Sequence, residues 1–149
     1  MKDKLSGLYS LAEQEHIPVD EHCPEEIMAM SVRLSNGRKI ISLSEESAYR
    51  DPSDPRSAYT KLERFGHEMG HCMTDSFYAG YSSLERRAKH EHKADCWAVE
   101  YLMPFDEICE AIRAGYTEVW DLAEYFGVSC SFVEKALGIH AQKGHVLPH

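Results

Sequence analysis

The sequence predicts an α+β fold, in which a small antiparallel sheet packs against helices and a helical subdomain follows. The sheet is indicated by an Asn36-Gly37 pair between two runs of apolar and small residues in "IMAMSVRLSNGRKIISLS". The helices are indicated by two long stretches of helical periodicity, at 60–74 and 84–103, and by three shorter ones between 105 and 138. At 149 residues, the chain is expected to form one domain, residues 1–149.

The first elements are a helix and a hairpin. Apolar residues from Leu5 to Ala12 recur at helical spacing and predict an amphipathic helix over 3–15. Both positions of an Asn-Gly pair tolerate positive φ, so Asn36-Gly37 predicts a tight turn between two antiparallel strands. The polar stretch that follows, 45–58, contains two prolines and is predicted to be a loop.

Two long helices complete the first part of the domain, residues 1–104. Thr60 and Glu63 have the spacing of a capping box, which satisfies free amides at a helix start, so the first helix is expected to begin at Thr60 and to end near residue 74. The second is expected to cover 84–103, because Pro104 cannot continue a helix cheaply.

The C-terminal subdomain, 105–138, is predicted to contain three short helices. Each is followed by a glycine, which commonly ends a helix. The expected helices are 105–114 before Gly115, 118–126 before Gly127 and 130–137 before Gly138. Residues 139–149 are expected to form a loose tail.

Composition excludes several classes of protein. The formal net charge is −9 and the pI is about 5.4, which argues against a nucleic-acid partner and against docking on an anionic membrane. No run of 18 apolar residues occurs, and the N-terminus has no apolar core of signal-peptide length, so we expect a cytoplasmic protein. The five cysteines are scattered and include no C-x-x-C pair, which suits free, mostly buried thiols in a reducing compartment.

The stretch His67-Glu68-Met69-Gly70-His71 predicts a metal site. On a helix, positions i and i+4 share a face, so the rings of His67 and His71 can point at one ion, and neutral imidazole is a good zinc ligand. Glu68 lies about 100° round the helix from His67. This is the arrangement of H-E-x-x-H hydrolases, in which the histidines bind Zn²⁺ and the glutamate acts as general base.

The helix at 84–103 supplies a third ligand. Glu91 and Asp95 fall at i and i+4 within its apolar stripe, where a carboxylate is costly unless it meets a cation or good donors. A zinc ion held by His67 and His71 removes this conflict, so Glu91 is predicted to be a ligand. Asp95, one turn on, is predicted to accept a hydrogen bond from the outer nitrogen of a ligand histidine.

Two further histidines flank Glu91 and compete with it for the ligand role. His90 and His92 face about 100° to either side of Glu91, so they are expected at the rim of the site.

These residues resemble a known family. "RFGHEMGHCM" followed by "EHKADCWAVEYLMP" is similar to the ImmA/IrrE family of small gluzincin-like zinc metallopeptidases of bacteria and phages. Glu91, Ala94, Asp95 and Ala98 match its pattern, which ends in Leu-Met-Pro at 102–104, whereas Trp97 stands where phenylalanine is commoner. The resemblance covers about residues 27–138 and is most specific over 65–104.

The resemblance implies a zinc-dependent endopeptidase that cleaves a regulatory protein, such as a phage-type helix-turn-helix repressor. A donor to the tetrahedral oxyanion is also expected, and Tyr78, Tyr81, His90 and His92 are the candidates. The hairpin strand at 38–44 is expected to offer an edge on which an extended substrate pairs.

Two other interpretations remain open at this stage. One is a metal-binding regulatory module that binds a partner protein without cleaving it. The other is a different zinc hydrolase, such as a deformylase, which needs a cysteine ligand; Cys23 stands next to His22 and Pro24 in a loop-like setting that does not suit this role.

Residues 121–138 have the spacing of a helix-turn-helix. The second helix of this pair offers Lys135 as its one cation, and acidic residues surround it. A DNA reader needs several phosphate contacts, so the pair is predicted to serve packing or partner recognition.

Overall fold

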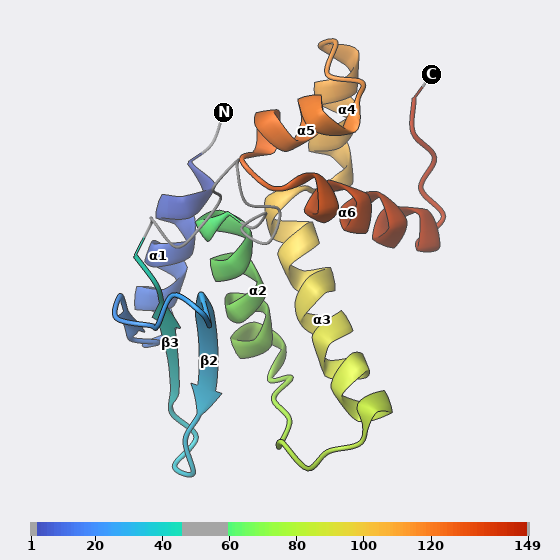
Figure 1. Cartoon of the computed structure of the whole chain (residues 1–149). Helices are drawn as coiled ribbons and strands as arrows, with labels where there is room; N and C mark the ends of the chain where they lie inside the picture. The colour runs from blue at the N-terminus through green and yellow to red at the C-terminus, as the bar shows by residue number, and fades with distance from the viewer. Residues whose placement is uncertain (1–2, 46–59, 149) are drawn as a thin grey trace.

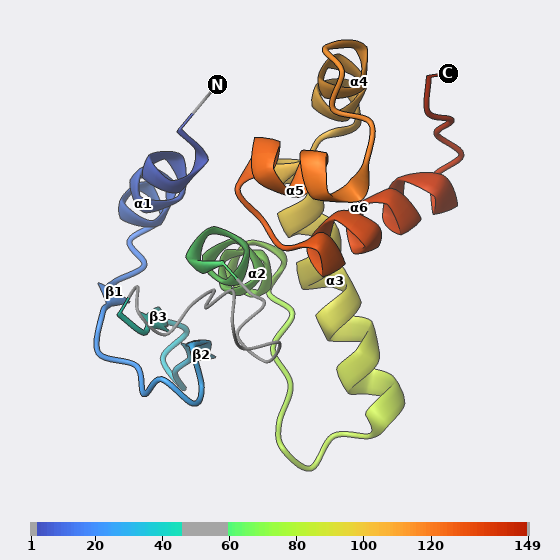
Figure 2. The same cartoon turned by 45° about the horizontal axis from the view of Figure 1, so that its top comes forward.

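Helix α2 (Lys61–Thr74) lies at the centre of the fold in the computed structural model, between the sheet and helix α3 (Leu84–Leu102), as Figures 1 and 2 show. The structure describes residues 3–45 and 60–148. Apart from Glu45, the loop predicted at 45–58 therefore lies outside the described residues. The α+β class is confirmed, and both long helices begin and end within a residue of the predicted bounds.

The sheet contains the predicted hairpin. Strands β2 (Ala29–Arg33) and β3 (Lys39–Leu43) pair antiparallel across a turn in which Gly37 has φ of 86°. A third strand, β1 (Val19–Asp20), pairs parallel with β3, so the sheet is mixed and has the order β1-β3-β2.

The sheet order corrects one expectation. Strand β3 is the central strand, so the prediction that 38–44 offers a free edge was wrong. Within the described residues, the outer strand next to α2 is β2, which has a neighbour on one side only.

Helix α1 (Lys4–Gln14) closes one end of the core, as its apolar spacing predicts. Leu8 and Ala12 are buried, and the ring of Tyr9 packs edge-on against Phe65 of α2, with ring centroids 4.9 Å apart. Helix α1 also contacts α3 and α4 (Phe105–Arg113), since Nζ of Lys4 donates to the carbonyl oxygen of Tyr101 and to Glu107, each 3.0 Å away.

The backbones of α2 and α3 come unusually close at Gly70. A Cβ atom at this position would lie 2.4 Å from the carbonyl oxygen of Ala94, closer than real Cβ contacts. Glycine within the H-E-x-x-H stretch therefore permits the contact that brings His67 and His71 to the turn of α3 carrying Glu91 and Asp95.

The capping box at the start of α2 is present and reaches further than predicted. Thr60 accepts from the amide of Glu63, and Glu63 Oε1 accepts from the amide of Thr60. The second carboxylate oxygen of Glu63 accepts from the hydroxyl of Ser129, 2.9 Å away, at the start of α6. Burial raises the pKa of Glu63 despite these donors.

The C-terminal subdomain contains helices α4 (Phe105–Arg113), α5 (Val119–Phe126) and α6 (Cys130–Gln142). The predicted stop at Gly138 is wrong, because α6 continues through it. Ile139 and His140 are buried in the core, and their burial offsets the roughly 1 kcal/mol that glycine costs within a helix. The tail is also less loose than expected, since the ring of His145 stacks on Phe105 at 4.3 Å.

The helix-turn-helix lookalike packs into the fold. Helix α6 contacts both α5 and α3, with Phe132, Val133 and Ala136 buried. This agrees with the predicted packing role.

The remaining sequence expectations concern thiols and membranes. All five cysteines are free, although only Cys23 and Cys72 are buried. Among residues 3–45 and 60–148, no helix has the length and apolarity needed to cross a membrane.

Candidate metal centre

Three side chains from α2 and α3 converge on one point. The Nε2 atoms of His67 and His71 lie 3.2 Å apart. Oε2 of Glu91 lies 2.7 Å from Nε2 of His67, and Oε1 lies 3.4 Å from Nε2 of His71. The structure thus brings together the three residues that the sequence predicted as ligands, and they form a group able to hold a metal ion.

The spacing and chemistry of these atoms fit zinc. Four ligands at about 2.0–2.1 Å around a tetrahedral ion lie about 3.3 Å from one another, close to the distances seen here. Two imidazoles and one carboxylate are a common catalytic set, which leaves a fourth position open. Without a cation or a proton between them, two Nε2 lone pairs and a carboxylate this close would repel one another.

Both imidazoles are oriented for this role by their outer nitrogens. Nδ1 of His67 lies 2.8 Å from Oδ1 of Asp95, and Nδ1 of His71 lies 2.6 Å from the carbonyl oxygen of Ser76. Carboxylates and carbonyls accept hydrogen bonds, so each ring donates from Nδ1, and a neutral ring then has its lone pair on Nε2, the atom that faces Glu91. The contact of Asp95 with the outer nitrogen of His67 is one of the two that helical spacing predicted.

The electrostatics of the cluster favour a proton on His67. Burial opposes a charge on His67, but hydrogen bonds to Asp95 and Glu91 outweigh it and raise the pKa of the ring to about 9. The hydrogen bonds that Glu91 makes with His67 and with His71 hold the pKa of the Glu91 carboxyl far below its usual range.

Zinc binding at neutral pH should therefore release a proton. In the metal-free protein His67 is charged below pH about 9, and the ring must lose its proton before Nε2 can bind a metal. We expect about one proton released per zinc at pH 7.5, and an affinity that falls about tenfold for each pH unit below 9. Calorimetry in two buffers of different ionisation enthalpy measures this number; a value of zero at pH 7.5 would contradict the assignment of His67.

Asp95 should influence the metal through His67. Asp95→Ala removes the acceptor that orients the ring, so metal affinity should fall about 10–100-fold. Asp95→Asn should be milder, because the amide oxygen still accepts the hydrogen bond. Zinc titration of both variants against Glu100→Gln, an exposed carboxylate change on the same helix, measures the effect. Equal affinities in all three would leave Asp95 without a role at the site.

Glu68 faces the sheet beside the histidines. Oε1 accepts a hydrogen bond of 2.7 Å from the hydroxyl of Ser31 on β2, and Oε2 lies 4.0 Å from Nη2 of Arg64, one turn earlier on α2. Glu68 is only 5% exposed, so these two contacts hold its carboxylate in one orientation.

These groups line one cleft of about 350 Å³, here called the metal cleft. It lies between β2, α2, the segment 76–78 and α3. Its lining residues are Ala29, Met30, Ser31, Arg64, His67, Glu68, His71, Ser76, Phe77, Tyr78 and Glu91.

The structure separates the four residues considered as oxyanion donors. Tyr78 lines the cleft and donates a hydrogen bond of 2.7 Å to Oε1 of Glu91, which, with burial, raises the pKa of Tyr78 to about 12. Tyr81 is 95% exposed. His90 stacks on Tyr78 from outside the cleft, and His92 contacts Cys96.

Sequence reasoning missed several groups that contact the site. Ser31 and Ser76 carried no signal, because neither belongs to a motif. Arg64 carried a weak signal, since it lies four residues before Glu68 on the same helix. Lys135 was considered only as a possible DNA-binding residue. Nζ of Lys135 lies 3.3 Å from Oδ1 of Asp95.

Comparison with known proteins gives one match. The family model Peptidase_M78, described as an IrrE N-terminal-like domain, matches residues 53–138. No significant match was found among curated proteins or among solved structures. The matched segment contains α2 to α5 and most of α6. It includes His67, His71 and Glu91 but not the hairpin. Because it covers more than half of the chain, the chain belongs to the Peptidase_M78 family of IrrE N-terminal-like, metallopeptidase-type domains, which is the ImmA/IrrE family that its motifs resemble.

Proposed function

We propose that the chain is a zinc-dependent endopeptidase. The observation that carries the proposal is the convergence of His67, His71 and Glu91 on one point, with Glu68 held beside them in the same cleft. Membership of a metallopeptidase-type family also supports it. A zinc ion in this position supplies a Lewis acid that polarises a carbonyl group and lowers the pKa of water.

Glu68 is the proposed general base. Its carboxylate opens onto the cleft and is held by Ser31, so it is placed to take a proton from the attacking water and deliver it to the leaving amine. Nη2 of Arg64 lies 4.0 Å from Oε2 of the same carboxylate, on the cleft side of α2. Asp95 and the carbonyl of Ser76 keep both histidines in the tautomer that offers Nε2.

Tyr78 is the proposed donor to the tetrahedral oxyanion. Its hydroxyl lies within the cleft at the edge of the ligand cluster, and His90 stacks on the ring from behind, with ring centroids 6.3 Å apart. Tyr78→Phe keeps the ring and removes the donor, so kcat should fall about 10²-fold while KM changes little. Tyr81→Phe, a matched change at an exposed tyrosine, should have no effect. Equal rates for Tyr78→Phe and the wild type would show that another group donates to the oxyanion.

The proposed substrate is an extended segment of a protein. Ala29, Met30 and Ser31 of β2 line the cleft, and β2 is the outer strand of the described sheet, so its backbone can pair with a substrate segment. A helix-turn-helix repressor of phage type is the proposed target. This rests on the resemblance to a family in which some members act on such repressors.

The target is tested by co-expressing the chain with helix-turn-helix proteins encoded by its genetic neighbours. We expect one of them to be cut at a single bond, which intact-mass spectrometry identifies, and to stay whole beside Glu68→Gln. Survival of every such protein beside the active chain would reject repressors as the target class.

A further inference from the structure

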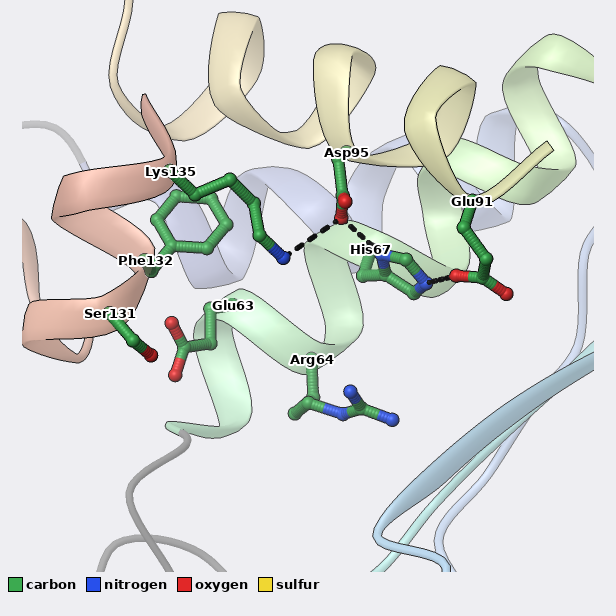
Figure 3. Close-up of a pocket in the computed structure, with 8 residues that line it drawn as sticks. All are labelled: Glu63, Arg64, His67, Glu91, Asp95, Ser131, Phe132 and Lys135. Carbon is green, nitrogen blue, oxygen red and sulfur yellow. Dashed lines mark hydrogen bonds and ion pairs between the residues drawn. The ribbon is translucent and has the colours of Figure 1, made fainter. Parts of the chain in front are cut away.

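A second hollow adjoins the metal cleft on the side of α6. It has a volume of about 160 Å³ and lies between α2, α3 and α6 (Figure 3). His67, Glu91 and Arg64 line both this hollow, here called the side pocket, and the metal cleft. A substrate whose backbone lies in the cleft can therefore place one side chain in the side pocket.

The carboxylates in the wall of the side pocket are already engaged. Glu63 is 2% exposed and accepts from the amide of Thr60 and the hydroxyl of Ser129. Asp95 accepts from His67 and Lys135, and Glu91 faces the histidine rings. None of the three needs a further cation from a ligand.

Lys135 is the group that remains available to a ligand. Its side chain is 44% exposed, and Figure 3 shows its ammonium pointing into the side pocket, with Asp95 at 3.3 Å. An ammonium has three donors, and Asp95 is the one hydrogen-bond partner it has among residues 3–45 and 60–148. Arg64 adds a second cation at the boundary with the cleft.

The charge balance favours an anion once a metal is bound. The three carboxylates of the wall carry one more charge than Lys135 and Arg64 together, and a divalent ion at the histidines turns this balance positive. Phe132 forms an apolar part of the wall, against which methylene groups can pack.

We propose that the side pocket binds an acidic side chain, Glu or Asp, of the substrate residue next to the cleaved bond, with Lys135 as the partner of its carboxylate. This inference rests on the proposed function. The volume suits one side chain of this size, and a lysine side chain would bring its ammonium against that of Lys135.

The proposal is tested with N-acetyl amino-acid hydroxamates, because the hydroxamate group binds zinc and leaves the side chain to probe the pocket. Binding of the glutamyl, glutaminyl, leucyl and lysyl compounds to zinc-loaded protein is measured by calorimetry. Acetohydroxamate, which has no side chain, reports the metal site alone. The glutamyl compound should bind about tenfold more tightly than the leucyl compound, as expected for a charge-assisted hydrogen bond, and the lysyl compound should bind most weakly.

Variants of α6 assign the preference to Lys135. Lys135→Met should abolish the glutamyl preference, and Lys135→Arg should keep it. Lys143→Met is a matched control, since Lys143 is the C-cap residue of the same helix, is 42% exposed and pairs with Glu100 away from the pocket. For each variant, the affinity of every amino-acid hydroxamate is divided by the affinity of acetohydroxamate. This ratio corrects for any effect that a change at Lys135 has on the metal site through Asp95.

The failures are distinguishable. If acetohydroxamate binds but the glutamyl and leucyl compounds bind equally, or if the glutamyl preference survives in Lys135→Met, the side-pocket proposal is wrong and the proposed peptidase stands. If no compound binds zinc-loaded protein, acetohydroxamate included, both are overturned.

Discussion

His67→Ala, His71→Ala and Glu91→Ala should each abolish stable zinc binding, whereas the wild type should hold about one zinc per chain. Each change removes one of three side chains whose donor atoms approach one another to 2.7–3.4 Å, and a zinc ion left with two protein ligands is held weakly. The loss should exceed ~100-fold in affinity, because removal of an outer hydrogen-bond partner alone costs about 10–100-fold. Elemental analysis after dialysis against a weak chelator measures it.

His92→Ala is the control for these variants. It removes an imidazole of the same helix as Glu91, but the ring contacts Cys96 and lies outside the cluster, so zinc content should be unchanged. Full zinc occupancy in Glu91→Ala together with loss in His92→Ala would transfer the third ligand position to His92.

Glu68→Gln should retain zinc and fold normally while losing at least ~10²-fold in kcat. The amide oxygen can still accept the hydrogen bond from Ser31, but it cannot take a proton from water, and a general base contributes about 10²–10⁴-fold. The rate is measured on a protein that the wild type cuts, with zinc content determined in parallel. Glu100→Gln, a change of the same chemistry at an exposed carboxylate, should leave the rate unchanged.

This variant also separates catalysis from binding. If Glu68→Gln keeps the biological effect of the chain in full, a metal-binding module that acts by contact with its partner becomes the better account. If Glu68→Gln loses zinc as well, Glu68 is part of the metal site and its assignment as a base fails.

The parts of the fold that local chemistry determines were predictable. Asn36-Gly37 predicted the hairpin turn, and the capping box predicted the start of α2. Each signal is made by residues only a few positions apart in the sequence. The grouping of His67, His71 and Glu91 was predictable because helical periodicity puts His67 beside His71, and because a carboxylate on the apolar stripe of α3 needs a cation. Strand β1 has only two residues and no periodicity to reveal it.

The missed features depend on contacts between distant parts of the chain. Helix α6 passes Gly138 because Ile139 and His140 are buried by elements far away in sequence. Ser31 reaches Glu68 across 37 residues and Lys135 reaches Asp95 across 40, so neither partner could be assigned from spacing along one helix. The strand expected to offer an edge proved central for the same reason, since β1 pairs on its far side.

Mapping of new protein N-termini in cells tests the peptidase most directly. Cells that express the wild-type chain, with its genetic neighbours present, are compared by mass spectrometry with cells that express Glu68→Gln at the same level. We expect at least one N-terminus that appears only with the wild type and that also disappears with His67→Ala. Identical sets of N-termini in all three, with zinc bound to the wild type, would contradict proteolysis as the function of this metal centre.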